Sequence, residues 1–450
     1  EARFLRAFYY HHMVIAFGGV PLIGDKVFGI NDIINLPRGT YAECVAYMVS
    51  ELDAAAADLA NITYKDIDFG RVTRGACLAL KSRVLLYAAS PLFNGGGISQ
   101  SPVIAYPTFS ASRWQQAADA AEAVIGLNQY SLNLDNATRP GNGFYQVFLR
   151  RVNNEYIFQY NRPTQKEFEA YYLPPTRTGA SIMKPTQSLV EAFPMIDGKT
   201  ITESSTYNPN DPYANRDPRF GKTVNPANYG YKGKPFGTAA LVSMSGYVFE
   251  LYNNPATTGP DVTTGGRNYT DAPLFTLSEV YLNYAEACAE LGTATNTDLD
   301  MSINKVRARA GIALLTTDGT NASAGGIQIN DPRRTATLEQ ISGAVNPLIW
   351  EVRRERQIEF MSWTTLRQMD IYRWKKGDYL DTNKNLDVNL GARIGTPTGT
   401  QTTVDANGYV KIYPTSTRNF EAKHYLMNIP TNDIDLYKAQ GVELKQNPGW

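Results

Sequence analysis

A dense set of charged side chains lies within an apolar helical pattern between residues 343 and 375. Apolar residues and an arginine share one face of the predicted helix, so at least one arginine points inward, toward the core. Side chains three residues apart on a helix are neighbours, which predicts the ion pairs Glu351–Arg354 and Arg356–Glu359. The shared face consists of Trp350, Arg354, Ile358 and Met361, and the charged residues are Glu351, Arg353, Arg354, Glu355, Arg356 and Glu359.

Two interpretations of this charged segment lead to different proteins. In the first, two of the glutamates form the carboxylate pair of a glycosidase. In the second, the glutamates and arginines form an ion-pair network that fixes the helix against its neighbours. Catalytic carboxylates usually come from separate elements around a cleft, whereas these share one helix with arginines that neutralise them. We therefore favour the structural interpretation.

The balance of charge limits the classes of partner. The 450 residues include 43 Lys plus Arg and 43 Asp plus Glu, so the net charge is zero. Nucleic-acid binding requires a basic surface, so we expect no nucleic acid as partner. Electrostatic attachment to a membrane surface is disfavoured for the same reason. Aromatic residues are plentiful, with 28 Tyr and 18 Phe, and they become the first candidates for ligand contacts.

Residues with catalytic or metal-binding chemistry are few. The three cysteines form no metal-binding spacing, and we expect buried free thiols, with one disulfide plus one free thiol as the alternative. His11 and His12 are adjacent, so their side chains diverge on a helix and cannot chelate together. Neither HExxH nor GxSxG occurs, so zinc and serine-hydrolase chemistry have little support. The cysteines are Cys44, Cys77 and Cys288, and the third histidine is His424.

One segment has a spacing that calcium loops use. The sequence DTNKNLD alternates oxygen-bearing side chains, which are the ligands that calcium prefers. The glycine and the closing glutamate of an EF-hand are missing, so a turn in which Asx side chains bond to their own backbone is favoured over a calcium site. We expect no cofactor, with weak calcium binding as the alternative. The candidate ligands are Asp381, Asn383, Asn385 and Asp387.

The sequence contains no predicted transmembrane helix. The longest apolar stretch, residues 13–23, is interrupted by Gly18, Gly19 and Pro21 and is shorter than the roughly 20 residues of a span. The first residues already follow a helical pattern, and a helix rarely begins without a cap. We therefore expect further residues upstream, and the lack of a targeting segment says nothing about localisation.

Helical patterns dominate both ends of the chain. Thr73 is placed to cap the clearest helix and Pro91 to end it, and this helix is apolar on two faces, so we expect neighbours on both sides. Gly292 separates two further helices in a hairpin of about 34 residues that resembles a tetratricopeptide repeat. The predicted helices cover residues 2–16, 40–60, 73–90, 112–127, 274–291 and 297–310. This predicts a mainly α fold built on a tetratricopeptide-like scaffold of helical hairpins.

The middle of the chain lacks regular periodicity. Pro, Gly, Asn and Thr are dense between residues 128 and 270, with short extended pieces at residues 155–160 and 247–252. Long loops with many aromatics indicate ordered, functional structure. We expect one compact unit with a helical part (residues 1–130), a loop-rich insertion with small β elements that forms a ligand-binding face (residues 131–270) and a helical C-terminal region (residues 271–450).

Aromatic residues in the predicted loops are the candidate ligand-binding residues. The C–H faces of sugar rings stack on aromatic rings, while polar side chains bond the hydroxyl groups. Any single aromatic residue more often packs in the core, but as a group they make a binding face credible. The candidates are Asn94, Tyr106, Phe109, Tyr171, Tyr172, Tyr229, Tyr231 and Tyr252.

Several long segments resemble the SusD/RagB family, in the order in which that family has them. They cover nearly the whole chain, so chance agreement is improbable. The N-terminal segments are EARFLRAFYYHHMVIAFGGVPLI and GRVTRGACLALKSRVLLYAASPLFNGG, and the middle ones are PTQSLVEAFPMIDG and YANRDPRF. The C-terminal segments are SEVYLNYAEACAELG, WEVRRERQIEFMSW, LRQMDIYRW, YLMNIP and QNPGW.

The resemblance implies a non-catalytic lipoprotein of the outer-membrane cell surface, with the helical scaffold and irregular face described above. It implies a SusC-like TonB-dependent barrel as partner, over which the protein acts as a lid, and a lipid anchor on a cysteine near the mature N-terminus, which this chain lacks. The implied ligand is usually an oligosaccharide and sometimes a peptide. The shared segments belong to the scaffold, so they transfer no binding residues.

Four functions follow as hypotheses. Glycan capture for import is favoured, and peptide capture by the same kind of lid is the alternative. A helical glycoside hydrolase would need two carboxylates on separate elements facing an aromatic cleft. A plain helical-repeat adaptor would lack the long aromatic loops.

Overall fold

The computed structural model describes most of the chain, in two compact units. The described residues are 1–65, 68–135, 141–161, 167–173, 179–180, 182–226, 230–231, 234–235, 244–253, 271–394 and 403–450. Unit 1 comprises residues 1–127, 368–377 and 420–450, and unit 2 comprises residues 128–367 and 378–419. Two C-terminal segments join the N-terminal helices in unit 1.

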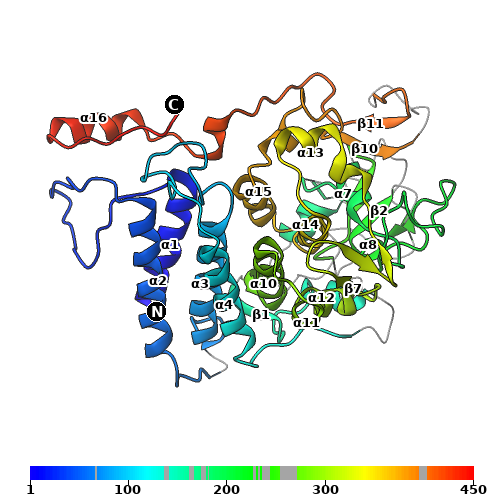
Figure 1. The fold of residues 1–450 in the computed structure, drawn as a ribbon, viewed down its shortest axis with the longest axis horizontal. Coiled ribbons are helices and arrows are strands. Elements are labelled where there is room, and N and C mark those ends of the chain that lie inside the picture. Colours follow the sequence, from blue (N-terminus) through cyan, green and yellow to red (C-terminus); the bar gives the residue numbers. More distant parts are fainter. Residues whose placement is uncertain are drawn as a thin grey trace. The chain divides into compact units, whose positions relative to one another are not determined.

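The first four helices of unit 1 form a row in which each packs against the next in sequence (Figure 1). Its helices are α1 (Ala2–Phe17), α2 (Tyr41–Asp58), α3 (Arg74–Ala89), α4 (Ser112–Ile125), the short 3₁₀ helix η5 (Ala422–Tyr425), α16 (Thr431–Ala439) and the C-terminal part of α15 (Thr364–Arg373). As predicted, the Thr73 side chain caps α3 by accepting a hydrogen bond from the N–H of Ala76 at 3.1 Å. Helix α3 packs against α2 on one side and α4 on the other, which explains its two apolar faces.

The turn after α1 explains its pair of glycines. Gly18 has φ = 79°, in the left-handed region that favours glycine. A Cβ on Gly19 would lie 2.0 Å from the carbonyl oxygen of Gly39, so only glycine fits where these two backbone segments meet. This contact fixes the loop that leads from α1 to α2.

Unit 2 combines helices with several small antiparallel sheets. Its helices are α5 (Asn142–Val147), α6 (Glu167–Tyr172), α7 (Gln187–Ala192), α8 (Phe220–Thr223), α10 (Leu277–Leu291), α11 (Asn296–Met301), α12 (Ile303–Ala310), α13 (Thr337–Ser342), α14 (Pro347–Glu359), and the 3₁₀ helices η3 (Pro332–Thr335) and η4 (Gly377–Leu380). Helix α14 is the predicted charged helix, and it packs against α10 and α7. The fold is therefore mainly α with small β elements, as predicted.

The sheets of unit 2 are short, and each pairs antiparallel strands. Strands β1 (Tyr156–Tyr160) and β5 (Tyr247–Phe249) confirm the two predicted extended pieces. Strand pairs are β1 with β6 (Ala272–Thr276), β2 (Val224–Pro226) with β5, β3 (Gly230–Tyr231) with β4 (Lys234–Pro235), and β10 (Leu390–Arg393) with β11 (Tyr409–Lys411); the three-stranded sheet joins β7 (Leu315–Thr317), β8 (Ala322–Ala324) and β9 (Ile327–Gln328).

Two predicted helices differ from the observed ones. The helix expected to begin at residue 274 begins at Leu277, because the preceding residues pair with β1 as strand β6 and Thr276 then caps α10. The helix expected at residues 297–310 is divided into α11 and α12 at Ser302, whose φ and ψ of −133° and −101° are not helical. The Ser302 hydroxyl donates to the carbonyl of Asp298 and so satisfies the end of α11. Gly292 ends α10 with φ = 72°, as its position predicted.

Candidate functional site

A buried ion network crosses the middle of unit 2. We use this name for seven residues: Glu155, Asp217, Arg219, Arg307, Arg309, Glu355 and Glu359. Arg219 donates hydrogen bonds to Asp217 at 2.7 Å and to Glu359 at 3.1 Å, and its guanidinium lies 2.6 Å from the carboxylate of Glu355. Each of the seven side chains is at most 2% exposed. A buried charge is tolerated only when it is paired and hydrogen-bonded, and these charges are.

The arginines of α12 complete the network. Arg307 lies 3.1 Å from Glu355 and also donates to the Ala313 carbonyl at 2.8 Å. Arg309 binds both oxygens of Glu155, at 2.7 and 2.8 Å, and pairs with Glu359. The network therefore ties α14 to α12, to the start of α8 and to the segment before β1.

The ion pairs predicted within α14 are partly found. Glu351 pairs with Arg354, as predicted. For the second predicted pair, each side chain has a partner on another element: Arg356 lies 3.2 Å from Glu286 of α10, and Glu359 binds Arg219 and Arg309. The sequence shows which charges are present but not which elements approach them in the fold.

The electrostatics of the network oppose a catalytic role for its glutamates. Burial disfavours the charged form of Glu355, but Arg219 and Arg307 outweigh it and hold the pKa of Glu355 below its usual range. Burial raises the pKa of Glu155, against the opposing effect of Arg309. A glycosidase needs two carboxyl groups that reach the glycosidic bond. These carboxylates are buried and paired with arginines, so they do not form such a site.

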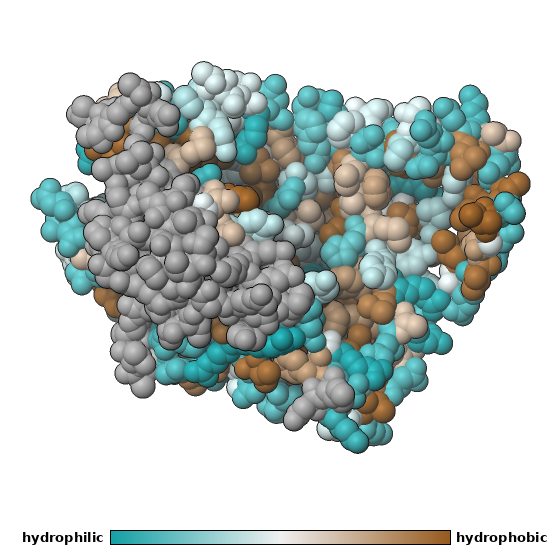
Figure 2. Space-filling view, turned by 180° about the vertical axis from the view of Figure 1, so that it is seen from behind, coloured by the Kyte–Doolittle hydropathy of each residue, from teal (hydrophilic) through white to brown (hydrophobic). Residues whose placement is uncertain are grey.

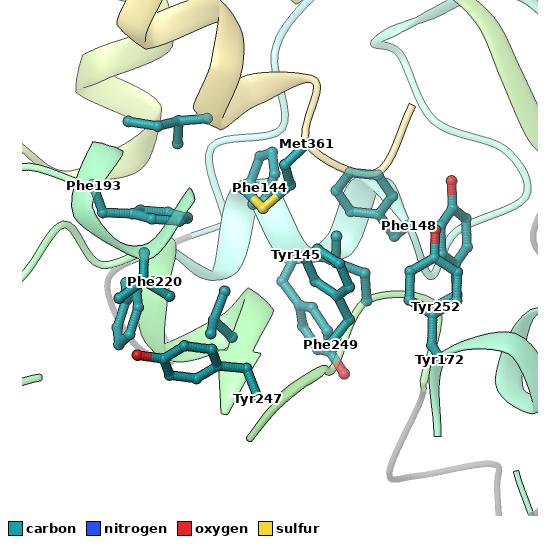
Figure 3. Packing of buried hydrophobic residues seen from close by; sticks show 14 of the residues in the cluster. Phe144, Tyr145, Phe148, Tyr172, Phe193, Phe220, Tyr247, Phe249, Tyr252 and Met361 are labelled. Atoms are coloured by element: carbon teal, nitrogen blue, oxygen red, sulfur yellow. The ribbon is translucent and has the colours of Figure 1, made fainter. Parts of the chain in front are cut away.

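Two of the predicted ligand-binding tyrosines lie in the core of unit 2. Tyr172 and Tyr252 are 4% and 3% exposed, and their rings lie 5.2 Å apart within the aromatic cluster that Figure 3 shows. Tyr252 also packs edge-on against Phe148, at 5.2 Å. Side chains so deeply buried present no face to a ligand, and this corrects their expected exposure. The sequence could not reveal this, since buried and exposed tyrosines have the same local signals.

In unit 1, two predicted residues hold the loop between α3 and α4. Asn94 is buried; its amide donates to the carbonyls of Ala89 and Ser110, and its oxygen accepts from Ser110 N–H at 2.9 Å. Tyr106 is half-buried, and the Arg113 guanidinium lies 3.6 Å from its ring centroid. Asn94 thus shapes the loop rather than presenting its amide to a ligand.

Of the four remaining predicted residues, two are exposed, and the side chains of the other two are not described. Phe109 and Tyr171 are exposed, by 65% and 42%, so they remain candidates, one in each unit. Tyr231 ends strand β3, and its side chain is not described. Tyr229 lies outside the described residues.

The candidate calcium loop is a hydrogen-bonded turn. The Asp381 carboxylate accepts a hydrogen bond from the N–H of Asn383 at 2.8 Å, and the Asn385 amide donates to the Tyr379 carbonyl at 2.9 Å. The Asn383 amide donates to Asn419 at 2.6 Å. Asp387 is exposed. Within the described ranges, no group of three or more His, Cys, Asp or Glu residues is arranged to hold a metal ion. The Asx turn expected from the sequence accounts for this segment.

A cluster of tyrosines and polar side chains that the sequence analysis missed lies on unit 2. We call it the tyrosine cluster: Gln187 and Glu191 of α7, Tyr207 and Tyr213 of the following loops, Tyr247 of β5, and Arg393 and Tyr409 on the paired strands β10 and β11. Within this cluster Tyr247 is buried, the other tyrosines are half-buried, and Arg393 is exposed. Arg393 and Tyr409 face each other across the strand pair. Residues so far apart in sequence give no local pattern, so only the fold reveals them together.

Hydrogen bonds fix the carboxylate of this cluster. The Tyr247 hydroxyl donates to the Gln187 amide oxygen at 2.6 Å, and the Gln187 amide nitrogen donates to Glu191 at 2.9 Å. Within the described residues, this is the one hydrogen bond that the Glu191 carboxylate accepts. Burial and the nearby Glu191 carboxylate raise the pKa of Tyr409. The cluster therefore offers aromatic rings beside an oriented carboxylate with free acceptor capacity, the combination that a polar ring-shaped ligand requires.

Among the described residues, no helix has both the length and the hydropathy needed to cross a membrane. Figure 2 shows small groups of apolar side chains, in brown, among hydrophilic ones on one face of the protein. The three cysteines are buried free thiols, as predicted.

Comparison with solved structures identifies the fold. The chain is similar to a SusD-like carbohydrate-binding protein from Bacteroides fragilis, with 23% identity, a TM-score of 0.71, and coverage of 97% of this chain and 78% of that one. A second SusD-like protein from Bacteroides fragilis gives 23% identity, a TM-score of 0.67, and coverage of 100% and 79%. A SusD superfamily protein from Bacteroides vulgatus has 19% identity and a TM-score of 0.61, with coverage of 100% of this chain and 77% of that one. The fold is thus that of the SusD-like proteins.

Sequence models of protein families identify the chain itself. The SusD family model matches residues 144–450, and a model described as starch-binding associating with outer membrane matches residues 1–86. The chain belongs to the SusD/RagB family, as its motifs predicted. No curated protein matches the sequence significantly.

The family segments of the sequence supply four of the seven residues of the buried ion network. YANRDPRF contains Asp217 and Arg219, and WEVRRERQIEF contains Glu355 and Glu359. These residues are buried and stabilise the scaffold.

Proposed function

We propose that this protein is a non-catalytic glycan-binding protein of the cell surface that delivers glycans to a SusC-like TonB-dependent transporter in the outer membrane. Membership of the SusD/RagB family is the observation that supports this proposal most strongly. A similar solved structure is described as a SusD-like carbohydrate-binding protein. Anchoring by an N-terminal lipid is part of the proposal and agrees with the family description of outer-membrane association.

The tyrosine cluster is the surface at which we place the glycan. Tyr207 and Tyr409 supply rings for the C–H faces of a sugar, and Glu191 and Arg393 supply an acceptor and a donor for its hydroxyl groups. Exposed Tyr171 also belongs to unit 2 and could extend the contact to a longer chain. Phe109 is the exposed candidate of unit 1.

A non-catalytic role agrees with the chemistry of unit 2. The carboxylates of α14 that might form a glycosidase pair are buried and neutralised by arginines. Burial and two described carboxylates, those of Glu191 and Asp405, raise the pKa of Tyr409. The Asp405 carboxylate already accepts hydrogen bonds from the backbone N–H groups of Asn407 and Tyr409. Binding without cleavage is the function that this arrangement supports best.

Calorimetric titration against soluble polysaccharides and mixed peptides tests this proposal. We expect saturable heat with one glycan and no released reducing ends. Tyr409→Ala should weaken glycan binding by about 1–3 kcal/mol, and Glu191→Gln should weaken it by about 1.5–3 kcal/mol, the usual contribution of a hydrogen bond to a charged group. Tyr9→Ala is the matched control, because Tyr9 is 61% exposed on α1 of unit 1. Heat with peptides alone would favour peptide capture instead.

A further inference from the structure

A groove of about 480 Å³ opens in unit 1 along α3, between α2 and α4. Leu78 and Leu85 of α3 form its floor, Val45 and Val49 of α2 line one wall, and α4 lines the other. The volume lies within the range of about 300–1,000 Å³ that is typical of ligand-binding sites. The groove belongs to the helical unit and is separate from the tyrosine cluster of unit 2.

The lining of this groove is unsuited to sugars. Its floor and walls are mostly aliphatic, whereas sugar rings prefer flat aromatic faces and several polar partners. Tyr106 is the aromatic residue of the lining, but the Arg113 guanidinium lies 3.6 Å from its ring centroid. Tyr41 also packs against it in a T-shaped arrangement, with 5.5 Å between the ring centroids. Lys81 on the floor is held by Asp53 at 2.6 Å. An apolar occupant therefore fits this groove better than a glycan.

The dimensions of the groove match a helix. Leu78 and Leu85 are seven residues apart, so they lie about 10.5 Å apart along the axis of α3, or two helical turns. Ala46 on the α2 side and Ala123 on the α4 side line the groove and are exposed. Such small side chains let another helix approach closely, since the distance between packed helices depends on the side chains at the contact.

The charge on the α4 wall adds a second constraint. Asp119 lines the groove and is exposed. Its carboxylate accepts a hydrogen bond from the Gln115 amide at 2.8 Å, and it pairs with no cation among the described residues. Lys81 is already neutralised by Asp53, so the groove has an unbalanced negative charge on this wall. A basic side chain on the occupant would complement it.

We propose that this groove binds an amphipathic α-helix of a partner protein. The helix would present apolar side chains at positions i, i+3 and i+7 to Leu78 and Leu85, which is the usual pattern of helix-in-groove recognition. A lysine or arginine on its flank would pair with Asp119. This docking surface extends beyond glycan capture and does not depend on it.

Fluorescence anisotropy with a synthetic peptide tests the proposal. The probe is a labelled helical peptide of about four turns, with leucines at i, i+3 and i+7 and lysines at their flanks. Its control is an isomer of the same composition in which the leucine spacing is scrambled. We expect the patterned peptide to bind the full chain with a dissociation constant below about 100 μM, and the isomer to bind at least about tenfold more weakly.

Variants of exposed residues locate the binding. Ala123→Trp should fill the groove, and Asp119→Lys should reverse its charge; each should weaken the patterned peptide about tenfold or more. The matched controls are Ala57→Trp on α2 and Glu122→Lys on α4, because both residues are exposed and neither lines the groove. Melting curves should be unchanged in all four variants.

Three results would overturn the proposal. The first is no binding of the patterned peptide up to about 1 mM, which corresponds to about −4 kcal/mol. The second is equal binding of the two isomers, or equal effects of Asp119→Lys and Glu122→Lys. The third is displacement of the peptide by a glycan that binds the wild type but not Ala123→Trp, which would make the groove a sugar site.

Discussion

Arg309 and Glu155 are 154 positions apart in the sequence, yet one guanidinium nitrogen of Arg309 binds both carboxylate oxygens of Glu155, at 2.7 and 2.8 Å. Arg309 is 0% exposed and Glu155 is 1% exposed. Their contact joins α12 to the segment that precedes β1. Because Arg309 also pairs with Glu359 of α14, this one side chain holds three elements of unit 2 together.

Replacing Arg309 by methionine should strongly destabilise unit 2. Removing one partner leaves Glu155 and Glu359 with uncompensated buried charge, which costs about 3–5 kcal/mol. The control is Arg150→Ala, because Arg150 and its partner Asp135 are 50% and 35% exposed, and such a surface pair contributes about 0–1 kcal/mol. Urea unfolding followed by fluorescence measures both variants. Equal shifts in the unfolding midpoint would contradict a stabilising role for the network.

The cysteines should not react in the folded protein. Burial raises the pKa of Cys77 to about 12 and also raises the pKa of Cys44. The thiolate is the reactive form, so at pH 8 an aromatic disulfide reagent should label no thiol of the native chain. Three thiols should react after unfolding in guanidinium. Rapid labelling of any thiol before unfolding would show that the helices around it open readily.

Truncating the buried Tyr252 should reduce stability, whereas truncating the half-buried Tyr409 should reduce glycan binding. Tyr252→Ala removes a buried ring from the aromatic cluster of unit 2 and should lower the free energy of unfolding by about 3–5 kcal/mol. Tyr409→Ala should change the free energy of unfolding by no more than about 0.5 kcal/mol, while it weakens glycan binding. Melting curves and calorimetry of the same two samples separate the outcomes. A large loss of stability in Tyr409→Ala would place that residue in the core.

Asp318 should give unit 2 a stabilising contribution that depends on pH. The side chain and backbone of Asn321, followed by the N–H of Thr320, bond its carboxylate and lower its pKa to about 2. Because the folded pKa is below the unfolded value of 3.8, the contribution is present above pH 4 and is lost as the pH falls toward 2. Melting curves of wild type and Asp318→Asn should therefore differ at pH 5 and converge near pH 2. A constant difference across this range would contradict the assignment.

Local sequence signals predicted the helices of the scaffold well. Thr73 and Gly292 act through residues close to them in the chain, so their roles as cap and terminator are visible in the sequence. The division at Ser302 was missed, because helical periodicity continues through it. The pattern of α14 likewise predicted the pair of Arg354 with Glu351, but not the partners of Arg356 and Glu359 on other elements.

The candidate ligand site was harder to predict, for a physical reason. The exposure of a tyrosine depends on which elements cover it, and Tyr172 and Tyr171 are adjacent in sequence but 4% and 42% exposed. The tyrosine cluster brings together α7, β5, β10 and β11 only after unit 2 has folded. Composition therefore does not reveal which aromatic residues are exposed.

Calorimetric titration of the chain with a panel of soluble polysaccharides, with released reducing ends assayed in the same samples, tests the proposed function most directly. We expect saturable heat with one class of glycan, no cleavage, and weaker binding in Tyr409→Ala than in Tyr9→Ala. Released reducing ends in proportion to the protein added, and absent from a matched blank, would contradict a non-catalytic capture protein.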